Sequence, residues 1–322
     1  MRTAAALGIA AFAIGLAVLS RTLSSYELVL ATRILIFAIL AMSLDLLVGY
    51  TGLSSLGHAA FFGMASYTIG LLSKNVTTNL FVTLAASIAA SAVLAAIFGA
   101  LALRSRGVYF MMLTLALSQV VWGIALQWRS LTGGDDGLPG IPRPWIGSMQ
   151  LTGSDGYYLF ALAAFLVCGT LLILIVHSPF GLTLQGIRES STRMSALGYN
   201  VWLHQYAAFV IAGTFAGVAG ALMAMQNGIT SPSSISIITG AEALLMVLLG
   251  GAGTMVGPFL GAVAVVLLEF NVSAHTDRWQ SVLGLIYILV VVGFPRGIYP
   301  PMRSLFTRAV SLRRGTAAGR AT

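Results

Sequence analysis

The stretch from Leu80 to Leu103 reads LFVTLAASIAASAVLAAIFGALAL and carries no ionisable side chain. It lies within a longer interval, from Lys74 to Arg104, that is free of charge between its two ends. A helix needs about 20 apolar residues to cross the hydrocarbon core of a bilayer, and this stretch is long enough. In hydrocarbon, every backbone N–H and C=O must be hydrogen-bonded within the protein. The stretch is therefore predicted to be a membrane-spanning helix.

The composition of the whole chain agrees with that interpretation. Hydrophobic residues make up 58% of the 322 residues and charged residues 8%, and the mean hydropathy is +0.93. A soluble domain carries about 25% charged residues. The sequence is that of an integral membrane protein, and a soluble protein is excluded.

Further intervals with few charges predict an all-α, polytopic membrane protein with about 8–10 transmembrane helices, some of them broken or re-entrant. The predicted segments are residues 4–19, 28–48, 56–72, 80–103, 108–128, 157–176, 205–225, 241–249, 257–270 and 282–294. Segments 241–249 and 257–270 fall short of the roughly 20 residues that a span needs and are expected to form one broken unit. Residues 1–300 are expected to form a single transmembrane domain, followed by a basic tail over 301–322.

The basic residues predict the orientation, because Lys and Arg stay on the cytoplasmic side of short loops. With the N-terminus inside, 11 of the 17 basic residues lie inside, five lie outside, and Arg33 falls within a span. Both termini are therefore expected in the cytoplasm. Segment 4–19 is interpreted as a retained span rather than a signal peptide, since its apolar run is long and no A-x-A site precedes a plausible cleavage point.

The formal net charge of +8 is explained by this topology and by anionic lipid headgroups. Membrane lipids are expected partners. Nucleic acid is not, because basic and aromatic residues are not interleaved as in nucleic-acid binding surfaces.

No pattern predicts an enzyme, a cofactor or a metal site. The four histidines are scattered without H-E-x-x-H spacing, and no G-x-S-x-G turn occurs. The one lysine, Lys74, lacks the preceding glycines of a phosphate-binding loop, so this chain is not expected to hydrolyse ATP. The one cysteine, Cys168, lies within a predicted span and is interpreted as a small apolar filler.

One polar stretch interrupts the apolar sequence, GLTLQGIRESSTRMSALGYN from Gly181 to Asn200. Apolar and small side chains recur there at steps of three and four residues, which predicts a short amphipathic helix in a cytoplasmic loop spanning 178–204. The stripe consists of Leu184, Ile187, Ser191, Met194 and Leu197, with Arg188, Glu189 and Arg193 off it. Thr183 is the expected N-cap, and Gly198 is expected to end the helix in the left-handed conformation. Two interpretations remain open, a stripe that enters a groove on a partner and a helix that rests on lipid headgroups.

Two glycine-rich stretches break apolar sequence, residues 49–63 and residues 250–261. Broken helices at membrane depth occur where they line a cavity or are buried in protein. Two interpretations of these stretches therefore stay open, that they line a translocation path and that they allow close helix packing. The candidate path residues are Asp45, Gly49, Gly52, His58, Glu242, Gly250 and Gly253. His58 is more simply explained as a neutral packing residue. For Gly217 and Gly220, close packing is the preferred interpretation.

Charged side chains within spans are costly and are expected to face the interior or water. Arg33 and Asp45 are separated by about 18 Å if one helix contains both, so they cannot pair. Arg33 is instead predicted to pair with Glu242; the alternative is that Arg33 reaches the outer interface and Glu242 meets water. Glu269, near the end of a predicted segment, is expected to reach the membrane interface. Asp135 and Asp136 belong to a glycine-containing outer loop.

Several motifs, in one order along the chain, resemble a known family. They are LDLLVGYTGLSSLGHAAFFGMASYT (44–68), LTGGDDGLPGIP (131–142), SPFGLTLQGIRESSTRMSALGYN (178–200), AGTFAGVAGAL (212–222), SPSS (231–234), LLMVLLGGAGTMVGPFLGA (244–262) and FPRGI (294–298). The sequence is similar, over nearly its whole length, to the permease subunits of bacterial branched-chain amino acid ABC importers, in the LivM-like branch.

The resemblance implies a complex and a mechanism. Its expected partners are a second, related permease subunit, two ATPase subunits and a periplasmic substrate-binding protein, all at the bacterial inner membrane. Loop 178–204 then corresponds to the cytoplasmic segment that couples the permease to the ATPases. The residues expected to couple are Leu184, Ile187, Arg188, Glu189, Met194, Leu197 and Gly198.

The same resemblance leaves the solute open. Branched-chain or related hydrophobic amino acids are the first expectation, and the alternatives are urea, an amide or an aromatic acid. A stand-alone channel or secondary transporter is the alternative from another class, and a membrane scaffold is a third. Relatives usually carry an acidic, alanine-rich run after IRE, where this chain has Ser190 to Met194. The choice of ATPase partner can differ accordingly.

Overall fold

The structure is a computed structural model of the chain. It describes residues 24–275 except 78, 144, 147–148 and 151–152, together with 278, 281–282, 284–285, 288–289, 293 and 297. The predicted segment 4–19, much of segment 282–294 and the basic tail 301–322 lie outside the described residues.

The described residues are almost entirely helical. In chain order the elements are α2 (Ser25–Asp45), η1 (Leu46–Thr51), α3 (His58–Asn75), α4 (Leu80–Ala102), α5 (Val108–Gln127), α6 (Arg129–Thr132), η2 (Gly134–Asp136), β1 (Leu138–Pro139), β2 (Trp145–Ile146), β3 (Met149–Gln150), α7 (Ser154–Val176), α8 (Pro179–Glu189), α9 (Ser191–Ala196), α10 (Val201–Asn227), β4 (Ile229–Thr230), η3 (Pro232–Ile235), α11 (Ile237–Gly250) and α12 (Val256–Ser273). The four strands have two residues each and form two antiparallel pairs, β1 with β4 and β2 with β3.

Six of the described helices are long and apolar enough to cross a membrane: α2 with its continuation η1, α4, α5, α7, α10 and α12. The prediction of an all-α, polytopic membrane protein is confirmed. Two details differ from the prediction. The sequence predicts that residues 257–270 are too short to span alone, but α12 has 18 residues and qualifies, whereas α3, which covers the predicted segment 56–72, is not among these six helices. Only α11, with 14 residues, remains short, because its apolar run ends at the glycine-rich turn after Gly250.

Local sequence sets the helix ends. At the start of α2, Ser24 and Glu27 form a capping box, in which each side chain accepts a hydrogen bond from the other residue's backbone N–H. At the start of α10, the side chain of Asn200 accepts from the N–H of Leu203, and Gly228 ends this helix with φ +68°.

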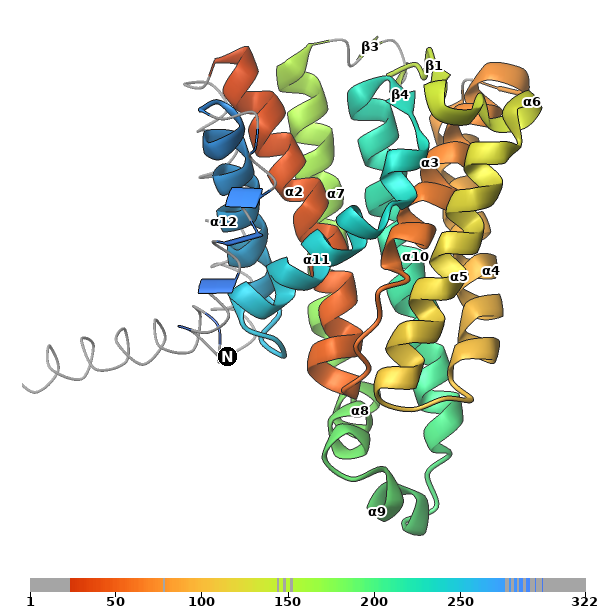
Figure 1. Cartoon of the computed structure of the whole chain (residues 1–322), viewed down its shortest axis with the longest axis vertical. Helices are drawn as coiled ribbons and strands as arrows, with labels where there is room; N and C mark the ends of the chain where they lie inside the picture. The colour runs from red at the N-terminus through yellow and green to blue at the C-terminus, as the bar shows by residue number, and fades with distance from the viewer. Residues whose placement is uncertain are drawn as a thin grey trace, which may run out of the picture.

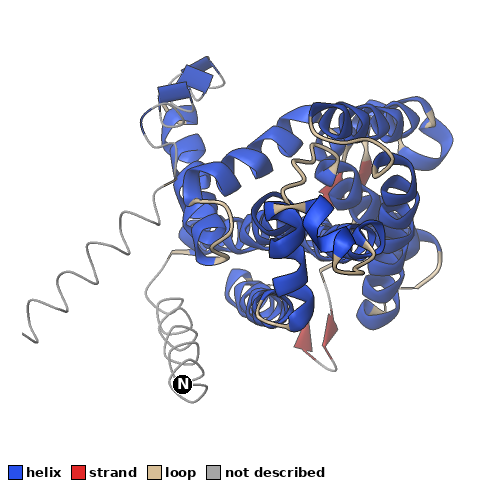
Figure 2. Cartoon of the chain, turned by 90° about the horizontal axis from the view of Figure 1, so that it is seen from below, coloured by secondary structure: helices blue, strands red, loops and turns tan. Residues whose placement is uncertain are grey.

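Figure 1 shows the spans standing side by side, with α8 and α9 projecting beyond one end of the bundle. In the same view α11 runs obliquely across the front, between α12 and α5. Figure 2, from below, shows that the strands are confined to loops around the helices. Helix α10 packs against α2, α3 and α4, and α12 packs against α2 and α11.

Small residues bring α10 close to its neighbours. The hydroxyl of Ser91 on α4 donates to the carbonyl of Gly213 at 2.8 Å, and that of Ser66 on α3 donates to the carbonyl of Gly220 at 2.7 Å. A methyl group at Gly220 would overlap the carbonyl of Phe62, and one at Gly217 would overlap Ser91. Close packing through small residues stabilises helix pairs in membranes, where apolar burial gives little driving force. The packing interpretation of Gly217 and Gly220 is confirmed.

This contact predicts a specific sensitivity. Gly220→Ala should lower the free energy of unfolding by about 1–3 kcal/mol, because the added methyl forces α10 away from α3. The measurement is the thermal melting of the detergent-solubilised protein. Gly123→Ala on α5 is the matched control, since nothing lies within 4 Å of a methyl group there. Equal melting temperatures for the two variants would contradict the account.

Candidate functional site

The α-helical part of the span formed by α2 and η1 ends at Asp45. After this residue the chain continues as the π-helix η1 and leaves it at Gly52, whose φ is +74°. Single π-helical turns within α-helices frequently mark functional positions. From Gly52 to Gly57 the chain is irregular, and it then begins α3 at His58.

The Asp45 carboxylate is fully buried and binds the turn between α11 and α12. Its oxygens accept hydrogen bonds from the backbone N–H of Gly253 at 2.7 Å and of Met255 at 3.3 Å. A buried charge is tolerated when it is hydrogen-bonded, and a carboxylate is further stabilised beside the start of a helix such as α12. Asp45 thereby fixes the end of α2 to the start of α12.

Glycine allows the turn to take this shape. Gly251 and Gly253 have φ of +109° and +82°, in the range that disfavours other residues. A methyl group at Gly49 would overlap both the N–H of Gly253 and the Asp45 carboxylate, and one at Gly250 would overlap the carbonyl of Gly257. The two glycine-rich stretches of the sequence therefore meet at one buried junction.

Arg188 of α8 joins the same junction from outside the bundle. Its guanidinium donates a hydrogen bond to the carbonyl of Gly49 in η1. It also lies close enough to Asp45 to interact with it electrostatically. We call Asp45, Gly49, Arg188, Gly253 and Met255 the junction.

The predicted amphipathic helix over 181–200 is two helices. Helix α8 ends at Ser190, which caps α9 by accepting from the N–H of Arg193 at 3.2 Å. Ser178, not Thr183, caps α8. Thr183 lies inside the helix, and its hydroxyl donates to the carbonyl of Pro179. Gly198 follows α9 with φ +89°, so the predicted left-handed stop is confirmed.

The apolar stripe of this segment does not form one free surface. Leu184 is 0% exposed and Ile187 is 3% exposed, so these two side chains face the chain's own bundle and are not available to a partner groove. Leu197 is 68% exposed and Glu189 is exposed, whereas Met194 is partly buried and lies against Gly186. The expectation of a continuous docking stripe is wrong for Leu184 and Ile187. The spacing of apolar residues shows which face of a helix is apolar, but not whether that face packs against the chain's own bundle or against a partner.

His58 lies apart from the junction, in an aromatic cluster. Its ring is 5.6 Å from that of Phe61, which in turn contacts the rings of Phe98 and Phe209. It is fully buried, and its ring nitrogens have no hydrogen-bond partner among the described residues. Of the remaining candidate path residues, Gly52 is exposed and Glu242 is partly buried.

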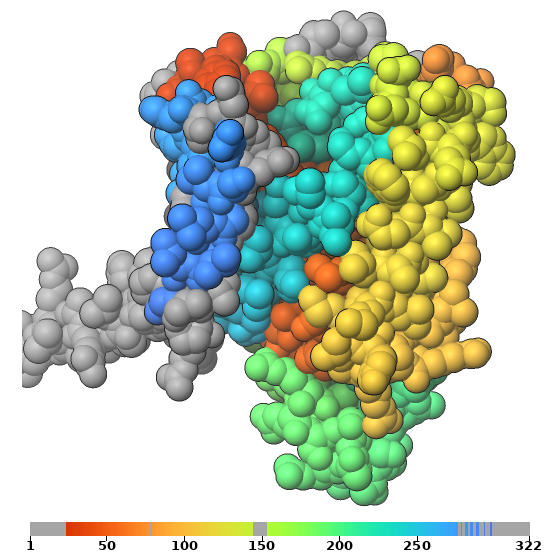
Figure 3. Space-filling view, viewed as in Figure 1, coloured from red at the N-terminus to blue at the C-terminus, as the bar shows by residue number. Residues whose placement is uncertain are grey.

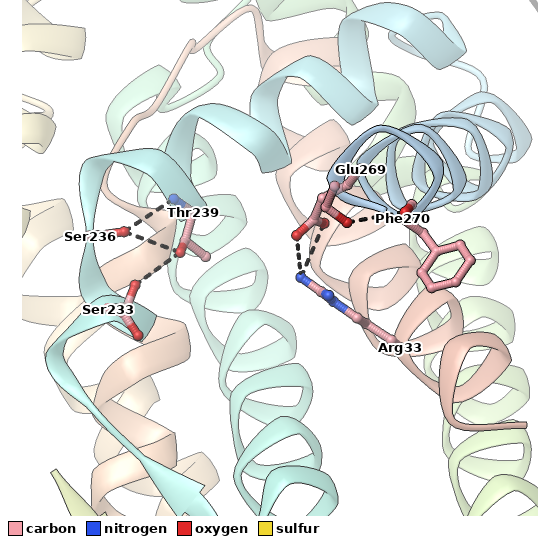
Figure 4. Close-up of polar contacts among 7 residues, drawn as sticks. Arg33, Ser233, Ser236, Thr239, Glu269 and Phe270 are labelled. Atoms are coloured by element: carbon pink, nitrogen blue, oxygen red, sulfur yellow. Dashed lines mark hydrogen bonds and ion pairs between the residues drawn. The ribbon is translucent and has the colours of Figure 1, made fainter. Parts of the chain in front are cut away.

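The pairing predicted for Arg33 is wrong in its partner. Arg33 on α2 forms an ion pair with Glu269 on α12, with Nη2 at 2.9 and 3.1 Å from the two carboxylate oxygens (Figure 4). Glu269 therefore does not simply reach the interface. Glu242 lies near enough to interact electrostatically with both residues. The sequence also offered Glu269 as a partner for Arg33, because Glu242 and Glu269 are both acidic residues of the later apolar segments. The structure selects Glu269, because the tilt of α11 sets the depth of Glu242 in the bundle.

The contact between Arg188 and Gly49 could not be predicted from the sequence. The acceptor is a backbone carbonyl in a distant segment, and a backbone carbonyl gives no residue pattern that would point to it. No cluster of three or more metal-ligand side chains occurs among the residues that the structure describes.

The sequence is similar to those of known proteins. Residues 27–292 match the family described as the permease component of branched-chain amino acid transport systems. The chain is 28% identical to the high-affinity branched-chain amino acid transport system permease protein LivM of Salmonella typhimurium, over 90% of this chain and 73% of the relative. It is 27% identical, with the same coverage, to the LivM protein of Escherichia coli. No solved structure matches.

The junction predicts an order of stability. Asp45→Ala leaves the N–H groups of Gly253 and Met255 without their acceptor, at a cost of about 1–3 kcal/mol for each buried donor. Asp45→Asn keeps one acceptor oxygen and should fall between Ala and the natural residue. Thermal melting in detergent measures the order, with the exposed Asp136→Asn as the control. Melting temperatures that are equal for Asp45→Ala and Asp136→Asn would contradict the role of Asp45.

Proposed function

This chain belongs to the family of permease components of branched-chain amino acid transport systems, and we propose that it is one membrane subunit of an ABC importer, driven by separate ATPase subunits. Its solute is a branched-chain or related hydrophobic amino acid. The observation that supports the proposal most is the junction, because a helix outside the bundle there binds the break at η1, and Asp45 binds that end of α2 to the turn between α11 and α12.

The proposed mechanism follows from the two sides of α8. On the bundle side, Leu184 and Ile187 are buried and Arg188 binds η1. A displacement of α8 is therefore transmitted to Gly49, and from η1 through Asp45 to the turn before α12. ATP binding to the ATPases moves α8, and the junction carries that movement into the membrane.

The opposite side of the same segment offers a docking surface. Leu182 and Leu197 are 64% and 68% exposed, and Glu189 and Arg193 of the same segment are exposed as well. Exposed apolar side chains on a short helix suit a groove on a partner. We assign this surface, with Gly198 ending it, to the ATPase subunit.

In this proposal the translocation path is closed at the α8 end. Asp45, Gly49, Gly250 and Gly253 are packed together there, whereas Gly52 and Glu242 keep exposed surface. His58 lies in its aromatic cluster and is not assigned to the path. The α8 end is the cytoplasmic end by the distribution of basic residues, which supports an inner-membrane protein with both termini in the cytoplasm.

The proposed partners are a second, related permease subunit, two ATPase subunits and a periplasmic substrate-binding protein. Uptake of labelled leucine by the reconstituted complex tests the function directly. Leucine uptake that requires ATP and the binding protein is expected. Retention of another solute, with no binding of leucine, isoleucine or valine, would refute the substrate assignment, and uptake without any ATPase would favour a secondary transporter.

Arg188→Gln should separate docking from coupling. The variant loses its hydrogen bond to η1 but keeps the outer surface of α8, so the ATPases should still co-purify while ATP-driven uptake falls at least tenfold. Arg106→Gln, the same change at an exposed position of the loop between α4 and α5, is the control. Normal uptake by Arg188→Gln would contradict the proposed transmission.

Leu182→Asp and Leu197→Asp should have the complementary effect. A charge in the docking surface should release the ATPases from the detergent-solubilised complex, and Val76→Asp, exposed outside this segment, should not. If the segment rests on lipid headgroups instead, the ATPases will co-purify with both variants and hydrolysis will still respond to the loaded binding protein.

A further inference from the structure

The turn between α11 and α12, residues 251–255, supplies the two N–H groups that bind Asp45. Its last residue, Met255, has φ +53° and is the one residue other than glycine with a positive φ in the part of the chain that the structure describes. The N–H of Val256 donates to the carbonyl of Thr254 at 2.6 Å, which closes a three-residue γ-turn around Met255. A γ-turn with positive φ at its central residue is rare and strained.

A strained turn persists only when its surroundings determine its shape. Within the turn, the hydroxyl of Thr254 donates to the carbonyl of Gly251 at 2.8 Å and accepts from the N–H of Gly257 at 3.0 Å. From outside, Asp45 binds the later part of the turn. The beginning of the turn, at Gly251, needs a support of its own, because none of these contacts reaches it from another segment.

Gly297 supplies that support, backbone against backbone. A methyl group on Gly297 would overlap the Cα and N atoms of Gly251 and would lie 3.0 Å from the carbonyl carbon of Gly250. Both Gly297 and Gly251 are buried, with φ of +76° and +109°. A backbone does not move aside as the end of a flexible side chain would. Position 297 therefore needs glycine both for its conformation and for this close approach.

The contact also gives a place to a sequence motif that the proposed mechanism does not use. Gly297 belongs to FPRGI, which follows directly on the predicted segment 282–294. Three other motifs already meet at the junction, 44–68, 178–200 and 244–262. Figure 3 shows that meeting point from outside, with the cyan end of α11 next to the orange-red segment around η1 and above the green of α8 and α9.

We propose that Gly297 is a positioning residue for the coupling between α8 and the membrane helices. Its backbone supports the turn at Gly251, so that the donors in the later part of the turn stay directed at Asp45. A displacement that enters through α8 and η1 then moves α12 instead of distorting the turn. The inference rests on the proposed function, and it adds a fourth segment of the chain to those that meet at the junction.

Gly297→Ala tests this role in the reconstituted complex. The added methyl should displace the turn, so that uptake of labelled leucine per ATP hydrolysed falls about tenfold, within the range typical of coupling between two sites. A variant that is only less stable yields less assembled complex, which lowers uptake and hydrolysis together and leaves their ratio unchanged. The ratio therefore separates a positioning role from a structural one.

Two control variants separate overlap from backbone strain. Gly107→Ala introduces a side chain at φ +60° with nothing within 4 Å of it, and so brings strain without overlap. Gly293→Ala lies four residues before Gly297, and its methyl also meets nothing within 4 Å. Both controls should keep the natural ratio of uptake to hydrolysis. A natural ratio in Gly297→Ala, or an equal loss in Gly107→Ala, would overturn the proposal.

A second variant covers the case in which Gly297→Ala does not assemble. Asparagine tolerates positive φ, but its Cβ meets the same overlap, so Gly297→Asn should assemble and lose coupling. Failure of both variants to assemble would overturn the positioning role and leave a structural one. Absence of ATP-dependent leucine uptake by the natural complex would instead refute the proposed function.

Thermal melting in detergent tests the link to Asp45 without any transport assay. Gly297→Ala and Asp45→Asn act on the two ends of one turn, so the double variant should lose less melting temperature than the sum of the two single losses. Gly220→Ala, whose overlap is with Phe62 on α3, should add to Gly297→Ala in full. Full additivity of the Gly297 and Asp45 variants would overturn the proposed support of the turn.

Discussion

The buried carboxylate of Asp45 is the constraint on which the rest of the junction depends. A charge without exposed surface is stable only if donors surround it, and here the backbone N–H groups of Gly253 and Met255 supply them. Those donors are available because the chain turns through positive φ at Gly251 and Gly253. The same approach leaves no room for a side chain at Gly49. One acidic residue therefore joins two glycine-rich breaks that are about 200 residues apart in the sequence.

In the proposed transporter, the junction connects α8 to the ends of two membrane helices. A displacement of α8 is then transmitted to these helices, whereas a flexible connection would absorb it. Arg188 adds the contact from α8, so that α8, the end of α2 and the turn before α12 share one set of hydrogen bonds. Farther along the same two helices, Arg33 and Glu269 join α2 and α12 again. The two helices are thus joined at two levels, and a displacement of α8 is expected to move them together.

The sequence predicted the spans well because hydrocarbon imposes a length and an absence of charge that can be counted. It predicted the stop at Gly198 because a left-handed residue has few alternatives to glycine. It did not predict the break at Ser190, since the three- and four-residue spacing from Ile187 to Met194 continues through that position. Nor did it predict which acid pairs with Arg33. Glu242 and Glu269 both suit the charge, and only the oblique course of α11 and its short length decide their depth.

The central claim is that α8 and the turn between α11 and α12 move together. Spin labels at the exposed positions Pro179, at the start of α8 and outside the docking surface, and Ala252, in a Cys168→Ala background, report the distance between them by electron–electron double resonance. A second pair, Pro179 with Arg106 in the loop between α4 and α5, supplies the reference. Between the nucleotide-free and the ATP-bound complex, the account predicts an unchanged distance from Pro179 to Ala252 and a changed distance from Pro179 to Arg106. A changed distance from Pro179 to Ala252, with the reference distance constant, would contradict it.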